Sequence, residues 1–388
     1  MLKQYILKMP GKVYCGENAI ENIGQILQGC RKVAVFTDKR IEASGVLDYP
    51  MQQIRRAGVD SVILDELPVE PTYMQAQQII DTFRESGADR IIAVGGGSVM
   101  DIAKLASIME DGLTVKELLD NPLAGKKKVA AIMIPTTAGT GAESTPNSIV
   151  AVPEKELKVG IVNPEMVADY VILDGTMIKR LPFSIAAATG VDAMCHAVEC
   201  FTSNKANPFS DLFALEAARL IFENIERACM DQDALEAKSN MLRAAFYGGV
   251  AIAASGTTAV HALSYPLGGK YHIAHGVSNA ILLLPVMHFN MDTCIPELSR
   301  IYDAIWREGT NNDGARFKEE EKAHAVLRRM EEILQKLKIP TSLTEFGVEP
   351  EDLDLLVDAG MQVTRLLLNN KKKVTPEDAR KIYQQVLH

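Results

Sequence analysis

The chain has 388 residues, of which 47% are hydrophobic and 23% charged, and its formal net charge at pH 7 is −9. A chain of this length buries a large core and is expected to divide into two domains. The acidic balance excludes wholesale binding to nucleic acid or to an anionic membrane surface.

The six cysteines form no C-x-x-C pair and no regular framework, which is typical of free thiols in a reducing compartment. The first ten residues lack the apolar segment and cleavage site of a signal peptide. No window approaches the roughly 18 uninterrupted apolar residues of a membrane span. We therefore expect a cytoplasmic protein without a membrane partner.

Short apolar, β-branched runs alternate with helical patterns over the first half of the chain. Strands are predicted at residues 32–37, 61–64, 90–94, 129–134 and 170–173, and helices at residues 51–57, 74–86 and 99–109. Such alternation predicts a mostly parallel sheet with helices on both faces. Residues 3–7 and 12–14 are predicted to add a hairpin, with Pro10 and Gly11 at its turn.

A triple glycine, Gly95-Gly96-Gly97, follows the strand predicted at residues 90–94 and leads through Ser98 into a helix. Glycines at such a turn let the backbone approach a ligand closely, and the new helix N-terminus presents unpaired N–H groups to a phosphate. The motif is neither the G-x-G-x-x-G of a Rossmann fingerprint nor a P-loop. A phosphate site and a turn used only for tight packing both fit it.

A second loop, residues 135–143, contains Thr136, Thr137 and Thr140 and follows the next predicted strand. Open α/β sheets bind ligands at this carboxyl edge, so two such loops favour a dinucleotide site. Asp38 ends the strand predicted at residues 32–37. An acid there accepts hydrogen bonds from a ribose and repels a 2′-phosphate, which favours NAD over NADP. An ordinary cap or turn residue is the alternative for Asp38.

Strand patterns almost disappear beyond residue 180. Helices are predicted at residues 184–201, 208–231, 234–255, 276–290, 319–337 and 375–387. The expected fold is therefore an α/β, Rossmann-like nucleotide-binding domain over residues 1–180, followed by an all-helical domain over residues 181–388.

The helix predicted at residues 184–201 is apolar on nearly every side and should be buried, yet it contains Asp192 and His196. The two residues are four apart and share one face of the helix. Burying an unpaired carboxylate is costly, and no Lys or Arg lies between Arg180 and Lys205. A bound metal ion would supply the positive charge. A hydrogen-bonded Asp–His pair in a core is the alternative interpretation.

Two further histidines, His261 and His275, lie in the same predicted domain. With Asp192 and His196 they make a set of three imidazoles and one carboxylate, which suits Zn²⁺ or Fe²⁺. Spacing alone does not show that these segments converge. Pro266 is expected to end or kink the segment that contains His261.

Taken together, these motifs resemble those of the iron-containing (group III) metal-dependent alcohol dehydrogenases over nearly the whole chain. The similar stretches are residues 95–104 (GGGSxxDxAK), residues 135–141 (PTTAGTG), residues 189–197 (TGxDAxxHA), and the His-Ala and His-Gly pairs that begin at His261 and His275. The resemblance implies a divalent metal, Fe²⁺ or Zn²⁺, held by Asp192, His196, His261 and His275. It implies NAD bound by Asp38, Gly95, Gly96, Gly97, Ser98, Asp101, Thr136, Thr137, Thr140 and Lys158. It also implies a homodimer or a larger homo-oligomer.

Some positions depart from the family pattern. Tyr265 stands where many members have a third histidine, so His272 becomes the candidate for moving a proton to solvent, with a surface histidine in a loop as the alternative. Glu70 stands in place of a frequent asparagine beside the cofactor. Ile252 stands in place of a frequent phenylalanine in the substrate pocket.

Candidate substrate residues are Asn147, Ile252 and Arg365. Arg365 is suited to an anionic tail such as a carboxylate or sulfonate, and a merely solvated arginine is the alternative. The expected reaction is the NAD-dependent, metal-dependent, reversible oxidation of a small primary alcohol, or the reduction of a short-chain aldehyde. An aldehyde with an anionic tail, such as sulfoacetaldehyde, is one candidate substrate. A glycerol or diol dehydrogenase, a dehydroquinate-synthase-like enzyme and a non-catalytic metal- or nucleotide-binding protein are the alternatives.

Overall fold

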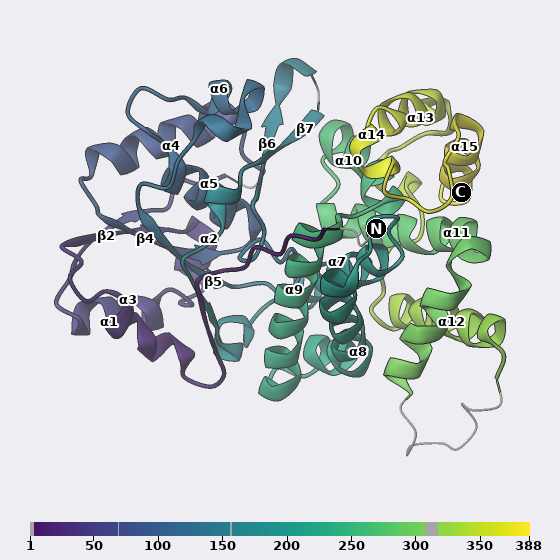
Figure 1. Ribbon diagram of the computed structural model, residues 1–388, viewed down its shortest axis with the longest axis horizontal. Helices are drawn as coiled ribbons and strands as arrows, with labels where there is room; N and C mark the ends of the chain where they lie inside the picture. The colour runs from purple at the N-terminus through teal and green to yellow at the C-terminus, as the bar shows by residue number, and fades with distance from the viewer. Residues whose placement is uncertain (1–3, 69, 156, 307–316) are drawn as a thin grey trace. The chain divides into compact units, whose positions relative to one another are not determined.

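The computed structural model describes residues 4–68, 70–155, 157–306 and 317–388 (Figure 1). The chain forms two compact units. One comprises Lys8–Leu181, and the other comprises Pro182–His388 together with residues 4–7. The first is an α/β unit and the second is helical, which confirms the predicted fold class.

A six-stranded sheet forms the centre of the α/β unit. Its strands are β1 (Lys12–Cys15), β2 (Lys32–Phe36), β3 (Asp60–Leu64), β4 (Arg90–Gly95), β5 (Ala130–Pro135) and β8 (Tyr170–Leu173). They lie in the order β1-β8-β5-β4-β2-β3, and every pair is parallel. The five predicted strands are all present. β4 and β5 are buried along almost their whole length, because a central parallel strand is covered on both faces.

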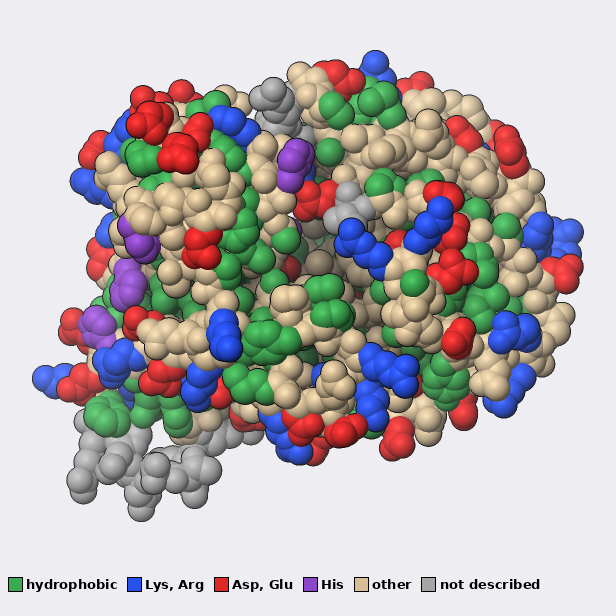
Figure 2. Space-filling view, turned by 180° about the vertical axis from the view of Figure 1, so that it is seen from behind, with side chains coloured by type: hydrophobic (Ala, Val, Ile, Leu, Met, Phe, Trp, Pro, Cys, Tyr) green, Lys and Arg blue, Asp and Glu red, His purple; other side chains and the backbone are tan. Residues whose placement is uncertain are grey.

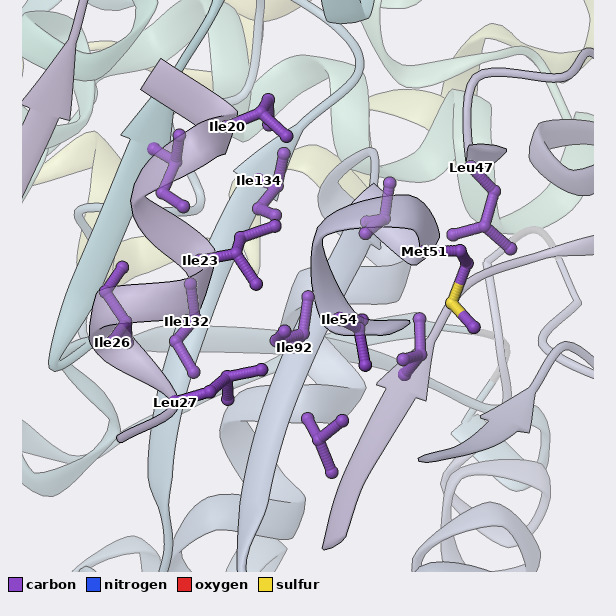
Figure 3. Close-up of a cluster of buried hydrophobic side chains, with 14 of the residues drawn as sticks. Ile20, Ile23, Ile26, Leu27, Leu47, Met51, Ile54, Ile92, Ile132 and Ile134 are labelled. Carbon is purple, nitrogen blue, oxygen red and sulfur yellow. The ribbon is translucent and has the colours of Figure 1, made fainter. Parts of the chain in front are cut away.

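Helices cover both faces of this sheet. They are α1 (Ile23–Ile26), α2 (Lys39–Ala43), α3 (Asp48–Arg56), α4 (Tyr73–Glu85), α5 (Gly97–Ile108) and α6 (Val115–Asp120). Figure 1 shows α4, α5 and α6 on the side of the sheet opposite α1 and α3. On the α1 and α3 side, Ile23 and Ile54 pack with Ile92 and Ile132 of the sheet in one buried apolar cluster (Figure 3). This core fixes the strands whose ends form the candidate cofactor site.

The predicted N-terminal hairpin is wrong. Residues 4–10 form no strand, and β1 pairs in parallel with β8. Gly11 lets the backbone before β1 lie close to the backbone of Asp169, because a Cβ atom at Gly11 would lie only 2.8 Å from the carbonyl oxygen of Asp169. The unit instead contains an antiparallel hairpin that was not predicted, formed by β6 (Asn147–Val152) and β7 (Leu157–Val162).

The second unit is built from helices in its described residues. They are α7 (Phe183–Phe201), α8 (Pro208–Met230), α9 (Leu235–Ser255), α10 (Ala259–Tyr271), α11 (His275–Ile305), α12 (Glu319–Lys336), α13 (Leu353–Met361), α14 (Thr364–Leu367) and α15 (Pro376–Gln384). α7 packs against α8, α9 and α11, and α10 packs against α11 and α13. α10 does not end at Pro266, and α11 continues well past residue 290, because tertiary packing stabilises both helices across their prolines.

The surface drawn in Figure 2 has acidic and basic side chains interspersed. Among the helices of the described ranges, none is both long enough and apolar enough to cross a bilayer.

Candidate metal and cofactor sites

Helix α7 brings two of the predicted ligands into the core of the helical unit. Asp192 and His196 are buried, with 1% and 4% of their surfaces exposed. Small residues make this burial possible. A Cβ atom on Gly190 would lie 3.0 Å from Ile225 of α8, so the two helices approach closely there. The acid and the imidazole therefore face other protein groups and not bulk water.

Two more helices complete the cluster. His261 lies in the first turn of α10, and His275 is the first residue of α11. One ligand atom each from Asp192, His261 and His275 lie within 4.8 Å of one another. The Nε2 atoms of His261 and His275 are both 3.8 Å from Asp192 Oδ1, and so is Nε2 of His196. The three predicted histidine ligands thus lie around one oxygen of the fourth, Asp192.

The surroundings of this cluster favour positive charge. Burial opposes the charge on Asp192, yet His196, His275 and His261 around it hold the pKa of this carboxyl below its usual range. Burial would lower the pKa of His261, but Glu199 and Asp192 raise it above its ordinary value. Imidazole nitrogens and a carboxylate oxygen that converge in a buried place fit a divalent cation such as Zn²⁺ or Fe²⁺.

Two residues at this cluster were missed from the sequence. Glu199 of α7 contacts Nδ1 of His261, and Asn279 of α11 donates from Nδ2 to Asp192 Oδ1 at 2.7 Å. Glu199 had a usable signal, because it is the second carboxylate within an apolar helix and lies three positions after His196. Asn279 lies one turn after His275, which places the two on one face of α11.

The candidate cofactor residues of the α/β unit lie around a change in strand order. β3 lies on one side of β2 and β4 on the other, so the chain reverses direction across the sheet at β2. Ligands of open α/β sheets bind at the carboxyl ends of strands at such a point. Asp38 follows β2, and its Oδ1 accepts hydrogen bonds from the N–H groups of Arg40 (2.8 Å) and Ile41 (3.0 Å). Asp38 is therefore a helix cap, as one interpretation of the sequence held.

The glycine turn and the threonine loop lie against each other. Gly96 is the N-cap of α5, and a Cβ atom there would lie 3.5 Å from Thr137 Oγ1. A Cβ atom on Gly97 would lie 3.0 Å from Thr140 Cγ2. In the structure as described, the buried Thr136 Oγ1 has no hydrogen-bond partner. An open helix N-terminus beside a buried hydroxyl fits an anionic ligand group.

The remaining predicted cofactor residues have protein partners. Asp101 forms a buried ion pair with Lys104 (2.9 Å). Ser98 Oγ accepts a hydrogen bond from the N–H of Glu70 (3.3 Å). Lys158 forms an ion pair with the same residue, Glu70, at 2.6 Å. Ser98 and Lys158 are thus linked through Glu70, beside the glycine turn.

The predicted substrate and proton-transfer residues lie on different elements of the two units. Asn147 is half-buried at the start of β6, and Ile252 is half-buried in α9. Arg365 is exposed on α14, a helix that packs against α10. His272 is exposed and ends α10 in a left-handed conformation, with φ of 55°.

A parallel α/β unit followed by a helical unit with a buried Asp/His₃ cluster defines a class of two-unit proteins with a candidate metal centre. Comparison with known proteins gives the family. Residues 10–175 match the model of iron-containing alcohol dehydrogenases, and residues 186–387 match the C-terminal model of the Fe-containing alcohol dehydrogenase family.

Individual proteins agree with these matches. The chain is 31% identical to long-chain-alcohol dehydrogenase 1 of Geobacillus thermodenitrificans (strain NG80-2) over 360 residues, covering 92% of this chain and 89% of the relative. It is 27% identical to the NAD-dependent methanol dehydrogenase of Bacillus methanolicus over 382 residues, covering 98% and 99%. It resembles the crystal structure of an iron-containing alcohol dehydrogenase from Thermotoga maritima at a TM-score of 0.83 with 30% identity, covering 99% of each chain.

The chain therefore belongs to the iron-containing alcohol dehydrogenase family. It is a metal-dependent alcohol dehydrogenase of that family.

Proposed function

We propose that the chain catalyses the NAD-dependent, reversible oxidation of a small primary alcohol to its aldehyde, at a divalent metal held by Asp192, His196, His261 and His275. The observation that carries this proposal is the convergence of ligand atoms from Asp192, His261 and His275 within 4.8 Å in the helical unit. Fe²⁺ is the favoured metal because of the family, and Zn²⁺ suits the same donors.

The chemistry divides between the bound groups and the side chains. A divalent cation at this cluster supplies Lewis-acid polarisation of an alcohol or carbonyl oxygen, and NAD supplies the hydride acceptor. Asp192 and the three imidazoles provide one negative charge and neutral donors, which leaves a site of net positive charge once a divalent cation is present. Asp192, His196 and His261 are buried, which excludes water from their side of the site, and His275 is half-buried.

NAD is the proposed cofactor for two reasons. One relative, the methanol dehydrogenase of Bacillus methanolicus, is described as NAD-dependent. In this chain, a carboxylate at Asp38 lies at the end of β2, where a 2′-phosphate would be repelled. The glycine turn, Thr136, Thr137 and Thr140, together with Asp101 and Lys158, are proposed to hold the rest of the dinucleotide.

Proton transfer to solvent is proposed for His272, which is exposed and three residues before His275. Replacing His272 by Gln should lower kcat for aldehyde reduction, because the imidazole could no longer pass a proton between the site and solvent. An unchanged kcat in this variant would assign His272 to the surface only.

The substrate class is tested by a comparison of tails. We propose a short-chain aldehyde, with Asn147 and Ile252 at the pocket and Arg365 as the residue that would select an anionic tail. Initial rates with propanal, succinic semialdehyde and sulfoacetaldehyde, measured for the wild type and Arg365→Ala, separate the options. A raised KM for the charged aldehydes alone supports the role of Arg365. Equal kcat and KM values of the wild type and Arg365→Ala for all three aldehydes would exclude a role of Arg365 in substrate selection.

The metal assignment is tested by His261→Ala, with His324→Ala as its control because His324 is exposed on α12. His261→Ala should lose the bound metal, measured by elemental analysis of anaerobically purified protein, and its turnover of NADH with aldehyde. His324→Ala should retain both. Wild-type metal content and rate in His261→Ala would overturn the proposal.

The alternative activities are separated by the same assay. A glycerol or diol dehydrogenase would prefer glycerol or 1,3-propanediol to propanol, and a dehydroquinate-synthase-like enzyme would not accumulate NADH. A non-catalytic protein would bind metal and nucleotide without turnover.

A homodimer or larger homo-oligomer is proposed from the family resemblance, and light scattering of the purified protein measures its mass.

A further inference from the structure

Glu199 is a buried carboxylate beside the candidate metal cluster. It lies on α7, seven residues after Asp192 and three after His196, so it shares their side of the helix. None of its surface is exposed. Within residues 4–68, 70–155, 157–306 and 317–388, no Lys or Arg forms an ion pair with Glu199. Such a group requires hydrogen-bond donors or a positive partner.

One oxygen of Glu199 binds the beginning of α10. Oε1 accepts hydrogen bonds from Thr258 N (3.0 Å), Thr258 Oγ1 (2.7 Å) and Val260 N (2.9 Å). The N–H groups of a first helical turn have no partner within the helix. Thr258, the N-cap of α10, does not cap the helix with its own side chain. Glu199 therefore caps α10 from a different helix.

The other oxygen of Glu199 contacts the candidate ligand His261. Oε2 of Glu199 is in contact with Nδ1 of this imidazole. A carboxylate only accepts hydrogen bonds, so Nδ1 must carry the proton in this contact. In a neutral imidazole the proton on Nδ1 leaves a lone pair on Nε2.

We propose that Glu199 is a positioning residue for the metal site: it holds His261 in the Nδ1–H tautomer, with the Nε2 lone pair directed at Asp192 and His275. This inference rests on the proposed function, because it takes His261 as a metal ligand. Carboxylates that accept a hydrogen bond from a ligand imidazole fix its tautomer and its orientation.

The far side of the ring supports the same tautomer. Nδ2 of Asn279 lies 3.1 Å from Nε2 of His261 and 2.7 Å from Asp192 Oδ1. The reversed amide would place its oxygen against the Asp192 carboxylate, so the nitrogen is the atom that faces the cluster. The amide has two N–H groups: one goes to Asp192, and the other lies between Nε2 of His261 and Nε2 of His275 (3.2 Å). A donor shared in this way fits a lone pair on Nε2 of His261, which agrees with the tautomer that the contact between Glu199 and Nδ1 assigns.

The geometry makes Glu199→Gln a sharp test. Glutamine has the same shape, and the three donors from Thr258 and Val260 require its oxygen on their side. Its NH₂ group then faces Nδ1 of His261, which must become the acceptor. The cap on α10 is retained, while the proton of His261 moves to Nε2, where it blocks a metal.

The control variant weakens the same helix without affecting His261. Tyr383 is fully buried and donates from its hydroxyl to the carbonyl oxygen of Leu263 in α10 (2.6 Å). Tyr383→Phe removes this hydrogen bond and should lower the thermal midpoint without changing metal affinity. A general loosening of α10 would instead weaken metal binding in both variants.

Metal affinity and tautomer are measured on the full-length protein stripped of metal. Titration with Co²⁺, followed by absorbance, should give about 10- to 100-fold weaker binding for Glu199→Gln than for the wild type. Nitrogen-15 NMR of histidine-labelled, metal-free protein should show Nδ1–H for His261 in the wild type and Nε2–H in Glu199→Gln. His261→Ala provides the assignment of the resonance.

The outcomes are distinguishable. Wild-type Co²⁺ affinity in Glu199→Gln, together with loss of binding in His261→Ala, would overturn this inference and leave the proposed function intact. Retained binding in His261→Ala would overturn the metal assignment and with it this inference. Should Glu199→Gln fail to fold, an Nε2–H tautomer in the metal-free wild type would by itself refute the role of Glu199.

Discussion

At the scale of single residues, Asn279 lies within hydrogen-bond distance of three candidate ligands, Asp192, His261 and His275. Its Nδ2 atom is 2.7 Å from Asp192 Oδ1 and 3.2 Å from Nε2 of His275. A hydrogen bond to a charged group contributes about 1.5–3 kcal/mol, and a carboxylate left without its donor keeps its desolvation cost. Asn279→Leu should therefore lower the free energy of unfolding of the metal-free protein by about 1.5–3 kcal/mol, measured by urea denaturation.

A double-mutant cycle checks the cause of that loss. In an Asp192→Asn background the charged partner is absent, so Asn279→Leu should cost much less. An equal cost in both backgrounds would attribute the loss to packing and not to the hydrogen bond.

Glu143 gives the α/β unit a dependence of stability on pH. Burial raises the pKa of Glu143 from 4.5 to about 7, and in the described structure its Oε1 atom has no hydrogen-bond partner. Between these pKa values the folded protein keeps a proton that the unfolded chain releases. The free energy of unfolding therefore falls as pH rises from about 4.5 to about 7, by up to about 3 kcal/mol.

Glu143→Gln should remove this contribution. The variant should be more stable than the wild type at pH 8 and nearly equal to it at pH 5, in urea denaturation of the cofactor-free protein. A stability difference that does not change with pH would show that Glu143 is not protonated in the fold.

At the scale of elements, the beginning of α11 lies against α7 at Gly276. A Cβ atom on Gly276 would lie 2.5 Å from the carbonyl oxygen of Ala188, and backbone cannot give way there. Gly276→Ala should separate the two helices and displace the neighbouring His275 from Asp192. We expect about 1–3 kcal/mol of lost stability and weaker Co²⁺ binding, measured by denaturation and by titration.

Gly24→Ala is the control for this variant. Gly24 lies within α1, where a Cβ atom would have nothing within 4 Å. Its replacement should leave metal affinity unchanged and preserve or raise stability. Equal metal affinity in Gly276→Ala and the wild type would contradict the close-packing argument.

The elements also show where local pattern is insufficient. β2, β4, β5 and β8 were predicted because each is an apolar run, and each is mostly buried in the sheet. β3 was predicted from its short apolar, β-branched run, although it lies at the edge of the sheet and is largely exposed. The β6–β7 hairpin was missed because the sequence of β6, NSIVAV, does not alternate polar and apolar residues, although the burial of these residues in the structure alternates. Asp101 connects the hairpin to α5, because the Asp101 carboxylate accepts a hydrogen bond from the N–H of Ile149 in β6 at 2.9 Å.

At the scale of the whole molecule, bound metal should stabilise the fold. A ligand that binds only the native state at 100 times its Kd adds about 2.7 kcal/mol, which corresponds to about 5–10 °C in the thermal midpoint of a domain near 200 residues. Chelation should lower the midpoint of the holoenzyme by that amount, and Zn²⁺ or Fe²⁺ should restore it. His261→Ala should show no shift. A shift of the same size in that variant would place the stabilising metal elsewhere.

The sequence by itself determined the fold class and the set of candidate chemical groups. The spacing of apolar residues separated the α/β half from the helical half, because short apolar runs predict strands and apolar residues three or four positions apart predict helices. The composition of the helix around Asp192 indicated a buried acid in need of a positive partner, a local property of the chain.

Only the tertiary structure decided which groups meet. Asp192, His261 and His275 are separated by up to 83 positions, and their distances depend on how α7, α10 and α11 pack. The contacts of Glu199 and Asn279 depend on the same packing. The position of Glu199 in an apolar helix is a local signal of a buried acid, but it does not show which group the acid contacts. α10 continues beyond Pro266, and β1 pairs with β8 and not with residues 3–7. In both places, contacts between distant segments outweigh the local preferences of the chain.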